Sequence, residues 1–338
     1  MRKILLIGTA LMLAACTAMQ PQGYNLKKSV SVAGEGGWDL VSVDSSLRRV
    51  YIAHNTKIDV LDADSGNVVG AVSPIDGAHG AVAVPTAGLG FATNGKSNKV
   101  TVFDLKTLAI TGEIATGEKP DSIIYDPATK HVFAFNADSD SATVIDPVKV
   151  KKIGTIPVKG APEFAVADGK GHIFLNLEDK NEMLDIDSRR MKVVKRWKLA
   201  PCTEPASLAL DNVNHRLFAG CNNNVLVVVD AQNGHVVTAL PVGKHVDATA
   251  FDASTHEIIS TAADGTMTII DQDDANHYHV VQTLETPQRS KTFALDGATH
   301  QLFVPSASFG PAPAPSKDNP KGRPSVLPGT FTVLIFER

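Results

Sequence analysis

Residues 99–127 read KVTVFDLKTLAITGEIATGEKPDSIIYDP, three short runs rich in β-branched residues that are separated by turn residues. The first run ends at Asp104 and the last ends at Asp126. Alternating apolar and polar residues, bounded by Gly, Asp and Pro, are typical of antiparallel strands joined by tight turns. The stretch lacks the 3.6-residue periodicity of an amphipathic helix. It therefore predicts strands, and the rest of the chain repeats it.

The acidic residue that ends each run recurs about every forty residues. One series lies at Asp62, Asp104, Asp146, Asp187, Asp230 and Asp271. A second lies at Asp44, Asp126, Asp168, Asp211, Asp252 and Asp296, with Pro85 in the second unit. Four short strands within a period of about forty residues are the signature of a β-propeller blade. The chain is therefore predicted to be all-β, a seven-bladed β-propeller spanning residues 26–338.

The two ends of the chain are predicted to share the last blade. After strands at 292–295, 301–304 and 331–336 the sequence ends, which leaves this unit without a fourth strand. Residues 26–32, LKKSVSV, resemble the fourth strand of the other units and precede the first complete unit. An N-terminal strand that closes blade seven would remove the open sheet edges. A Pro-rich insertion at 306–328 separates two strands of that blade and is either a tolerated loop or a lid over one face.

The N-terminus carries an export signal. Arg2 and Lys3 precede an apolar run, residues 4–13, that is too short for a permanent membrane span. The run ends in Leu-Ala-Ala-Cys, which resembles the lipobox of bacterial lipoproteins and implies cleavage after residue 15 and lipidation of Cys16. Residues 16–25 would then form a tether. Thr17 in place of Asp favours the outer membrane by resemblance to Gram-negative sorting rules, so we expect a periplasmic, lipid-anchored protein.

Composition limits the partners and the redox state. The net charge is −4 with a pI near 6.3, so no overall basic field attracts nucleic acid. Besides Cys16 the chain has Cys202 and Cys221, which lie 19 residues apart within one repeat unit. In an oxidising compartment such a pair predicts a disulfide. A two-cysteine metal site is the alternative, although CxxC spacing is absent.

The repeats resemble those of the YncE-like YVTN-repeat β-propeller family of exported bacterial proteins. The segments that carry the resemblance are KVTVFD, ATVID, PDSIIYDP, APEFAVADGKGHIFLNLEDK and PCTEPASLALDNVNHRLFAGC. The resemblance covers nearly the whole mature chain and implies the propeller fold and a periplasmic or surface-exposed location. Some relatives are linked to nucleic-acid binding or to metal-related operons. More remotely, the chain resembles quinoprotein dehydrogenase subunits and lactonase propellers. Fold alone does not fix the function.

The candidate site is one mouth of the central channel. Because the first strand of each blade lines the channel, the positions five before the second marker series should gather there. These positions are Asp39, Gly80, Asp121, Glu163, Ala206, Asp247 and Lys291, with His79, Glu204 and Arg289 close by in sequence. Converging carboxylates would raise one another's pKa or hold a divalent cation, for which Asp39, Asp121, Glu163 and Asp247 are the candidates. Alternatively, they cap loop N–H groups in a hydrated channel mouth.

Three classes of function follow from these features. The first is a binding or scaffold propeller for an unknown small ligand or protein partner. The second is an enzyme, either a metal-dependent lactonase-like hydrolase or a dehydrogenase subunit, although no cofactor site or catalytic motif is evident. The third is nucleic-acid binding through a basic stripe on neighbouring outer strands, which otherwise is a solvated edge. The stripe comprises Lys149, Lys151, Lys152, Arg189, Arg190, Lys192, Lys195 and Arg196.

Overall fold

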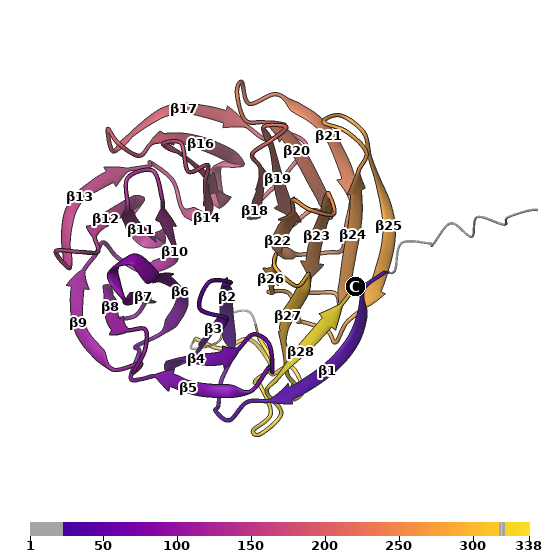
Figure 1. The fold of residues 1–338 in the computed structure, drawn as a ribbon. Helices are drawn as coiled ribbons and strands as arrows, with labels where there is room; N and C mark the ends of the chain where they lie inside the picture. Colours follow the sequence, from indigo (N-terminus) through magenta and orange to yellow (C-terminus); the bar gives the residue numbers. More distant parts are fainter. Residues whose placement is uncertain (1–22, 318, 320–321) are drawn as a thin grey trace, which may run out of the picture.

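Seven four-stranded antiparallel sheets are arranged in a ring around a central channel, as Figure 1 shows. The computed structural model describes residues 23–317, 319 and 322–338. It confirms the all-β, seven-bladed β-propeller, and its helical elements are three single turns: η1 (Pro85–Ala87), η2 (Ala137–Ser139) and η3 (Glu178–Lys180). The predicted signal peptide, Cys16 and most of the tether lie outside the described residues. Within the described part of the chain, no helix has the length and apolarity that a membrane crossing requires.

Each of the first six blades is one continuous segment, numbered outward from the channel. Blade one comprises β2 (Trp38–Asp44), β3 (Arg49–His54), β4 (Lys57–Asp62) and β5 (Val68–Val72). Blade two comprises β6 (Ala78–Val84), β7 (Leu89–Asn94), β8 (Lys99–Asp104) and β9 (Ile110–Ala115). Blade three comprises β10 (Pro120–Asp126), β11 (His131–Asn136), β12 (Ser141–Asp146) and β13 (Lys151–Pro157). Blade four comprises β14 (Pro162–Ala167), β15 (His172–Leu177), β16 (Glu182–Asp187) and β17 (Lys192–Lys198). Blade five comprises β18 (Pro205–Asp211), β19 (Arg216–Cys221), β20 (Val225–Asp230) and β21 (Val236–Pro241). Blade six comprises β22 (Val246–Asp252), β23 (Glu257–Ala262), β24 (Thr266–Gln272) and β25 (Tyr278–Glu285).

Blade seven is built from both ends of the chain, as predicted. Its order from the channel outward is β26 (Ala294–Asp296), β27 (Gln301–Ser306), β28 (Thr332–Glu337) and β1 (Asn25–Ser31). The innermost strand is shorter than predicted and starts two residues later. The propeller also begins earlier than predicted, because Tyr24 is fully buried and β1 starts at Asn25. Both residues were assigned to the tether.

The repeated Asp residues form turns. The Asp104 carboxylate accepts hydrogen bonds from the backbone N–H groups of Lys106 and Thr107, at 3.0 and 2.7 Å. Asp44 does the same for the N–H groups two and three residues later. Side chains of Asp that bond their own backbone stabilise such turns. The markers thus recur because every blade needs the same turns, and the period reflects the fold.

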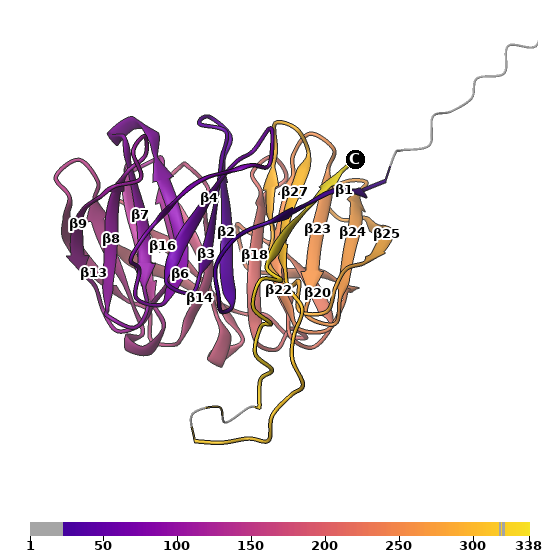
Figure 2. The same ribbon diagram turned by 90° about the horizontal axis from the view of Figure 1, so that it is seen from below.

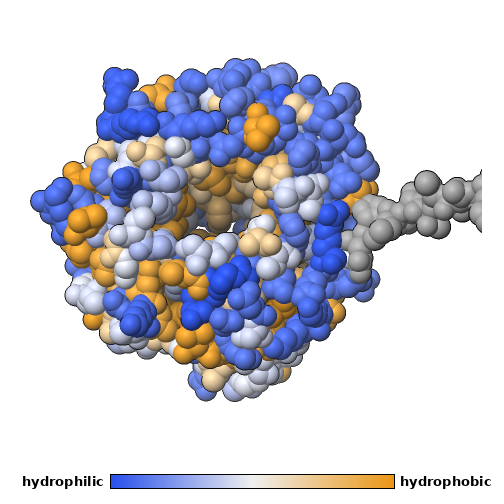
Figure 3. Space-filling model, in the orientation of Figure 1, coloured by the Kyte–Doolittle hydropathy of each residue, from blue (hydrophilic) through white to orange (hydrophobic). Residues whose placement is uncertain are grey.

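The core consists of seven separate layers. Among the described residues, each buried apolar cluster lies between two neighbouring blades; one joins Phe133 and Val144 of blade three to Leu175 and Leu184 of blade four. Outer strands are polar and exposed, and Figure 3 shows hydrophilic side chains over β17 and β21 and a hollow at the centre of the ring. Side chains at the start of the first strands therefore line the mouth of the central hollow.

The insertion in blade seven leaves the ring on one face. Figure 2 shows it projecting well beyond the blades, between β27 and β28. Its base is a short ladder in which Phe309 pairs with Val326 and the Gly310 N–H donates to the Ser325 carbonyl at 2.9 Å. Connections between second and third strands lie on the same face as the starts of the first strands. The insertion therefore emerges at the mouth of the channel where the candidate residues were predicted.

Candidate functional site

Strand pairing places one residue per blade at the channel mouth. In blade three Pro120 pairs with Asn136, and in blade two Ala78 pairs with Asn94. The residue of blade two that corresponds to Asp121 is therefore His79, and the assignment of Gly80 was wrong by one position. The error arose because β6 ends at Val84, so Pro85, which begins η1, is not the equivalent of Asp126. The corrected ring is Asp39, His79, Asp121, Glu163, Ala206, Asp247 and Lys291.

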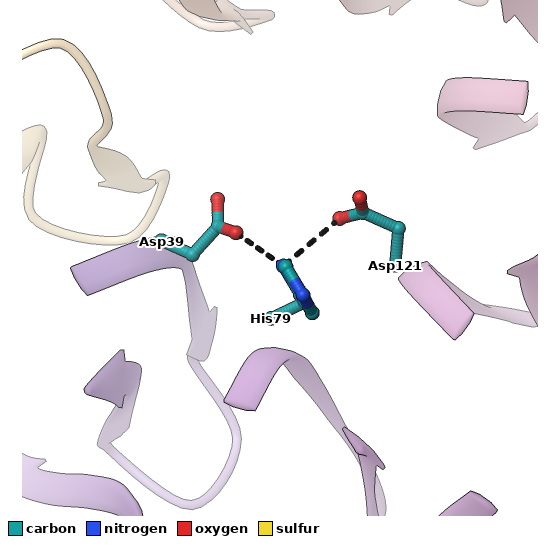
Figure 4. Close-up of side chains that lie close together, drawn as sticks. All are labelled: Asp39, His79 and Asp121. Carbon is teal, nitrogen blue, oxygen red and sulfur yellow. Dashed lines mark hydrogen bonds and ion pairs between the residues drawn. The ribbon is translucent and has the colours of Figure 1, made fainter. Parts of the chain in front are cut away.

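Three ring residues from adjacent blades contact one another (Figure 4). His79 Nδ1 lies 2.6 Å from an oxygen of Asp39 and 3.5 Å from an oxygen of Asp121. Burial lowers the pKa of the His79 imidazole, but the hydrogen bond to Asp39 and the charge of Asp121 outweigh it and raise the pKa overall. Burial, together with the charge of Asp39, raises the pKa of Asp121 to about 6, although His79 opposes the shift. The contact between His79 and Asp121 thus couples the protonation of these two groups.

The other ring carboxylates differ in their partners. Asp247 forms an ion pair with Lys291, with 2.5 Å between the carboxylate oxygen and the ammonium nitrogen. Burial nevertheless raises the pKa of Asp247. Glu163 has no ion pair or hydrogen-bond partner among the described residues, and burial plus the surrounding carboxylates, Asp121 first, raise its pKa well above the ordinary value. A cation beside Glu163 would lower this pKa, because it would favour the ionised carboxylate.

Buried side chains of the second strands fix the ring positions. Thr93 of β7 donates to the backbone carbonyl of Asp121 at 2.8 Å, and Thr261 of β23 donates to that of Lys291 at 2.6 Å. Each bond joins a second strand to the ring residue of the next blade. Sequence reasoning missed both residues, because a Thr within a strand carries no signal of a contact with another blade.

The loops that lead into the first strands add further charges. Lys119, Glu204, His245 and Arg289 each lie two residues before a ring position and have positive φ, between 50° and 69°. Positive φ is uncommon in residues other than Gly, so these four loops share an unusual backbone conformation at the same position. Glu204 is held in addition by Asn222, whose amide donates to its carboxylate at 2.9 Å. The positions of Glu204 and Arg289 at the mouth were predicted.

These groups surround a cavity of about 980 Å³ at the mouth. Its lining includes Asp121, Glu163, Glu204, Asp247, Arg289 and Lys291 of the predicted residues. Asp39 and His79 lie beside it through their contact with Asp121. The lining also includes Glu178, Asp179, Lys244, Asp264 and Arg323. Arg323 belongs to the insertion, which therefore contributes to the site. The cavity is polar and strongly charged on all sides.

The geometry narrows the metal prediction. In the described residues, the group whose ligand atoms lie close enough for one cation is Asp39, His79 and Asp121, with atoms within 4.8 Å of one another. Glu163 and Asp247, the other two predicted ligands, lie outside this group. Two carboxylates and one imidazole suit a divalent transition metal. The same atoms are also satisfied by a protonated His79 between two carboxylates.

The disulfide between Cys202 and Cys221 is confirmed, with a Cα–Cα distance of 5.5 Å. It lies next to the site, because Cys202 precedes Glu204 by two residues and Cys221 precedes Asn222. The disulfide therefore connects the loop that presents Glu204 to the strand that ends beside its amide partner. A metal site at these two cysteines is thereby excluded in the oxidised protein.

Three of the eight residues of the basic stripe form ion pairs with carboxylates. Lys149 pairs with Asp146 at 2.8 Å, and Arg196 pairs with Glu182 at 2.6 Å. Lys195 lies 3.5 Å from the buried Asp185. Such pairing leaves less unbalanced positive charge for a polyanion than the sequence indicates.

Comparisons with known proteins support the fold. No protein-family model matches the chain, and no curated protein sequence matches it. A chain of Kuenenia stuttgartiensis hydrazine synthase is similar in structure, with a TM-score of 0.72 and 14% identity over 81% of this chain and 94% of that one. A chain of the mitotic checkpoint complex is similar at a TM-score of 0.75 and 15% identity, over 98% of this chain and 99% of that one. At these identities the likeness shows the β-propeller fold alone.

Proposed function

We propose that this protein is a binding propeller that takes a small charged ligand in the mouth of its channel. The observation that carries the proposal is the cavity of about 980 Å³, into which ionisable side chains converge from several blades. Clefts with convergent polar groups and shifted pKa values are the usual places for ligands. The propeller serves as a rigid scaffold, and the loops and insertion supply the chemistry.

Binding can be tested on the mature chain beginning at Thr17, which retains every described residue. A thermal-shift screen of small charged metabolites should find a ligand that raises the melting temperature, because a ligand of the folded state stabilises it. The double variant Glu163→Gln/Arg323→Gln should lose the shift. The double variant Glu113→Gln/Lys106→Gln, altered on exposed side chains away from the mouth, should keep it. A screen in which no compound shifts the protein, or in which both variants respond equally, contradicts the proposal.

We further propose that the protein is an exported lipoprotein of the YncE-like type, anchored in the periplasm through Cys16. The Cys202–Cys221 disulfide is consistent with an oxidising compartment. Replacement Cys16→Ser should abolish labelling by radioactive palmitate and release the protein from the membrane fraction. Unchanged sedimentation with outer membranes would contradict the lipid anchor.

A metal-dependent hydrolase of the lactonase-like class is the second candidate, favoured by the Asp39–His79–Asp121 group. A divalent cation would displace the proton of His79, so its affinity should rise with pH. Titration of the metal-free protein with Zn²⁺ or Mn²⁺ at pH 6 and pH 8 should then give one equivalent bound, and more tightly at pH 8. Absence of stoichiometric binding, or equal binding by His79→Ala, would reject this candidate.

The dehydrogenase and nucleic-acid alternatives stay predictions, since no observed feature favours either. A nucleic-acid interface would predict affinity that falls steeply with salt concentration. The ion pairs of Lys149, Lys195 and Arg196 reduce the positive charge that three of the eight stripe residues would offer to a polyanion.

A further inference from the structure

The charges at the mouth are divided between two walls. An acidic wall is formed by Asp121, Glu163 and Glu204, which lie at or just before the first strands of blades three, four and five. Glu178 and Asp179, in the η3 turn of blade four, extend it. Lys119 is the basic exception on this side. Burial raises the pKa of Asp121 and of Glu163, and nearby carboxylates, Asp39 for the first and Asp121 for the second, add to the shift.

The opposite wall is basic. Lys244 precedes β22, Arg289 precedes β26, and Arg323 comes from the insertion of blade seven. Asp247 and Asp264 are acidic exceptions; Asp247 is already paired with Lys291, and Asp264 accepts the Lys244 backbone N–H at 2.7 Å. Figure 1 shows β14, which carries Glu163, across the channel from β26. The cavity thus has a negative and a positive side.

The structure holds the Arg289 side chain and the Arg323 backbone in place without neutralising either charge. The Arg289 guanidinium lies over the Phe309 ring, 5.3 Å from its centroid, at the base of the insertion. The backbone of Arg323 is clamped by Asn319, which accepts its N–H at 2.9 Å and donates to its carbonyl at 2.8 Å. Neither guanidinium, nor the Lys244 ammonium, has an ion-pair partner among the described residues.

We infer that the ligand is a short linear zwitterion of the peptide class, with its ammonium group toward Glu163 and its carboxylate toward Arg289 and Arg323. Glu163 and the two guanidinium groups carry charges of opposite sign without ion-pair partners among the described residues, and they match a ligand that carries both charges at its two ends. Arg presents a planar donor pair that suits a carboxylate. This inference rests on the proposed binding function and specifies its ligand.

Size and lining indicate a peptide rather than a single amino acid. A cavity of about 980 Å³ lies at the upper end of the range for small-molecule sites. The apolar residues in its described lining are Ala206 and Ala263, so no pocket is formed for a large apolar side chain. Trialanine with free termini is therefore the appropriate probe.

The test is calorimetric titration of the chain beginning at Thr17 with trialanine, N-acetyl-trialanine and trialanine amide. We expect the free peptide to bind and each capped peptide to bind about tenfold or more weakly, since a lost charged contact costs about 1.4 kcal/mol or more. Glu163→Gln should weaken the free peptide but not the acetylated one. Arg323→Gln should weaken the free peptide but not the amide. Glu113→Gln and Lys106→Gln serve as matched controls, and circular dichroism confirms that each variant is folded.

Two outcomes would overturn the inference. One is that free trialanine shows no binding at concentrations up to about 10 mM, since a weaker affinity would not amount to specific recognition. The other is that the free and the capped peptides bind equally. If trialanine fails while another compound stabilises the protein and loses its effect in Glu163→Gln/Arg323→Gln, the peptide inference is wrong and the proposed binding function stands. If no compound binds at all, both are wrong.

Discussion

At Asp121, burial and neighbouring negative charge act together against ionisation. The side chain is 18% exposed, it faces Asp39 across His79, and its pKa is raised to about 6. A protein selected only for stability has no need of such a group, because an uncharged side chain would fit there at less cost. A carboxyl group whose pKa is raised this close to neutral pH is typical of a site that exchanges protons with a ligand or a metal.

Replacement Asp121→Asn should stabilise the protein at high pH. The folded-state pKa of Asp121 lies above the unfolded value of 3.8, so the folded state binds the proton more tightly. Stability from this group is complete below about pH 4 and is lost as the pH rises through about 6. Since one pKa unit corresponds to about 1.4 kcal/mol, the shift from 3.8 to about 6 predicts a gain on the order of 3 kcal/mol for the variant at pH 8.

Urea unfolding between pH 4 and pH 8 measures this difference. The free energies of unfolding of the two proteins should converge near pH 4 and separate between about pH 4 and pH 6, and the difference should stay constant at higher pH. A variant that is less stable than the parent at pH 8 would show that the contact with His79 outweighs the burial of the charge.

At the scale of single elements, the disulfide both stabilises blade five and fixes part of the site. It closes a loop of 19 residues, for which the chain-entropy model gives about 3 kcal/mol. The free energy of unfolding of the double variant Cys202→Ala/Cys221→Ala should therefore be lower by that amount, and its urea midpoint should fall accordingly. Because Cys202 lies two residues from Glu204, ligand binding at the mouth should weaken as well. If the double variant has the same urea midpoint as the oxidised parent, the disulfide does not stabilise the blade. If the two proteins also bind the ligand equally, the disulfide does not fix the site.

The insertion should be dispensable for folding and necessary for the site. Its base is closed by the bond from Gly310 to Ser325 and another from the Leu327 N–H to the Ser308 carbonyl, at 2.8 Å. Deletion of residues 311–324 would join groups that are already adjacent, so the melting temperature should change by no more than about 2 °C. The loss of Arg323 should weaken binding of a carboxylate-bearing ligand. A large fall in melting temperature would instead assign the insertion a structural role.

These elements show which features a sequence can reveal. The blades could be predicted because a turn needs its Asp locally, so Asp62 and Asp104 mark equivalent places without any knowledge of the rest. His79 was predicted to lie at the mouth, but its ring position was assigned to Gly80, because blade two replaces that Asp with Val84 followed by Pro85. Thr93 and Arg323 could not be found, since the first acts across a blade boundary and the second lies in a segment with no repeated counterpart.

At the scale of the whole molecule, stability depends on closing the ring. Every core cluster of the described chain lies between two blades, so an open ring would lose one complete layer. The N-terminal segment contributes to both layers that flank blade seven: Tyr24 belongs to the layer shared with blade six, and Val32 to the layer shared with blade one. Gln282 of β25 fixes Tyr24 by bonding both its N–H and its carbonyl, each at 2.9 Å.

Replacement Tyr24→Ala should consequently destabilise the protein by about 3–5 kcal/mol, the usual cost of truncating a buried aromatic residue. Val213→Ala, on a side chain that is 82% exposed, should have little effect and serves as the control. Deletion of residues 23–31 is the stronger test: it should abolish cooperative unfolding, and a synthetic peptide of residues 23–33 added in trans should restore it, because β1 contributes a complete edge strand to β28. The comparison is made by thermal melting. If the shortened chain melts like the intact one without the peptide, the N-terminal strand does not hold the ring closed, and the stability of blade seven must come from β26, β27 and β28 alone.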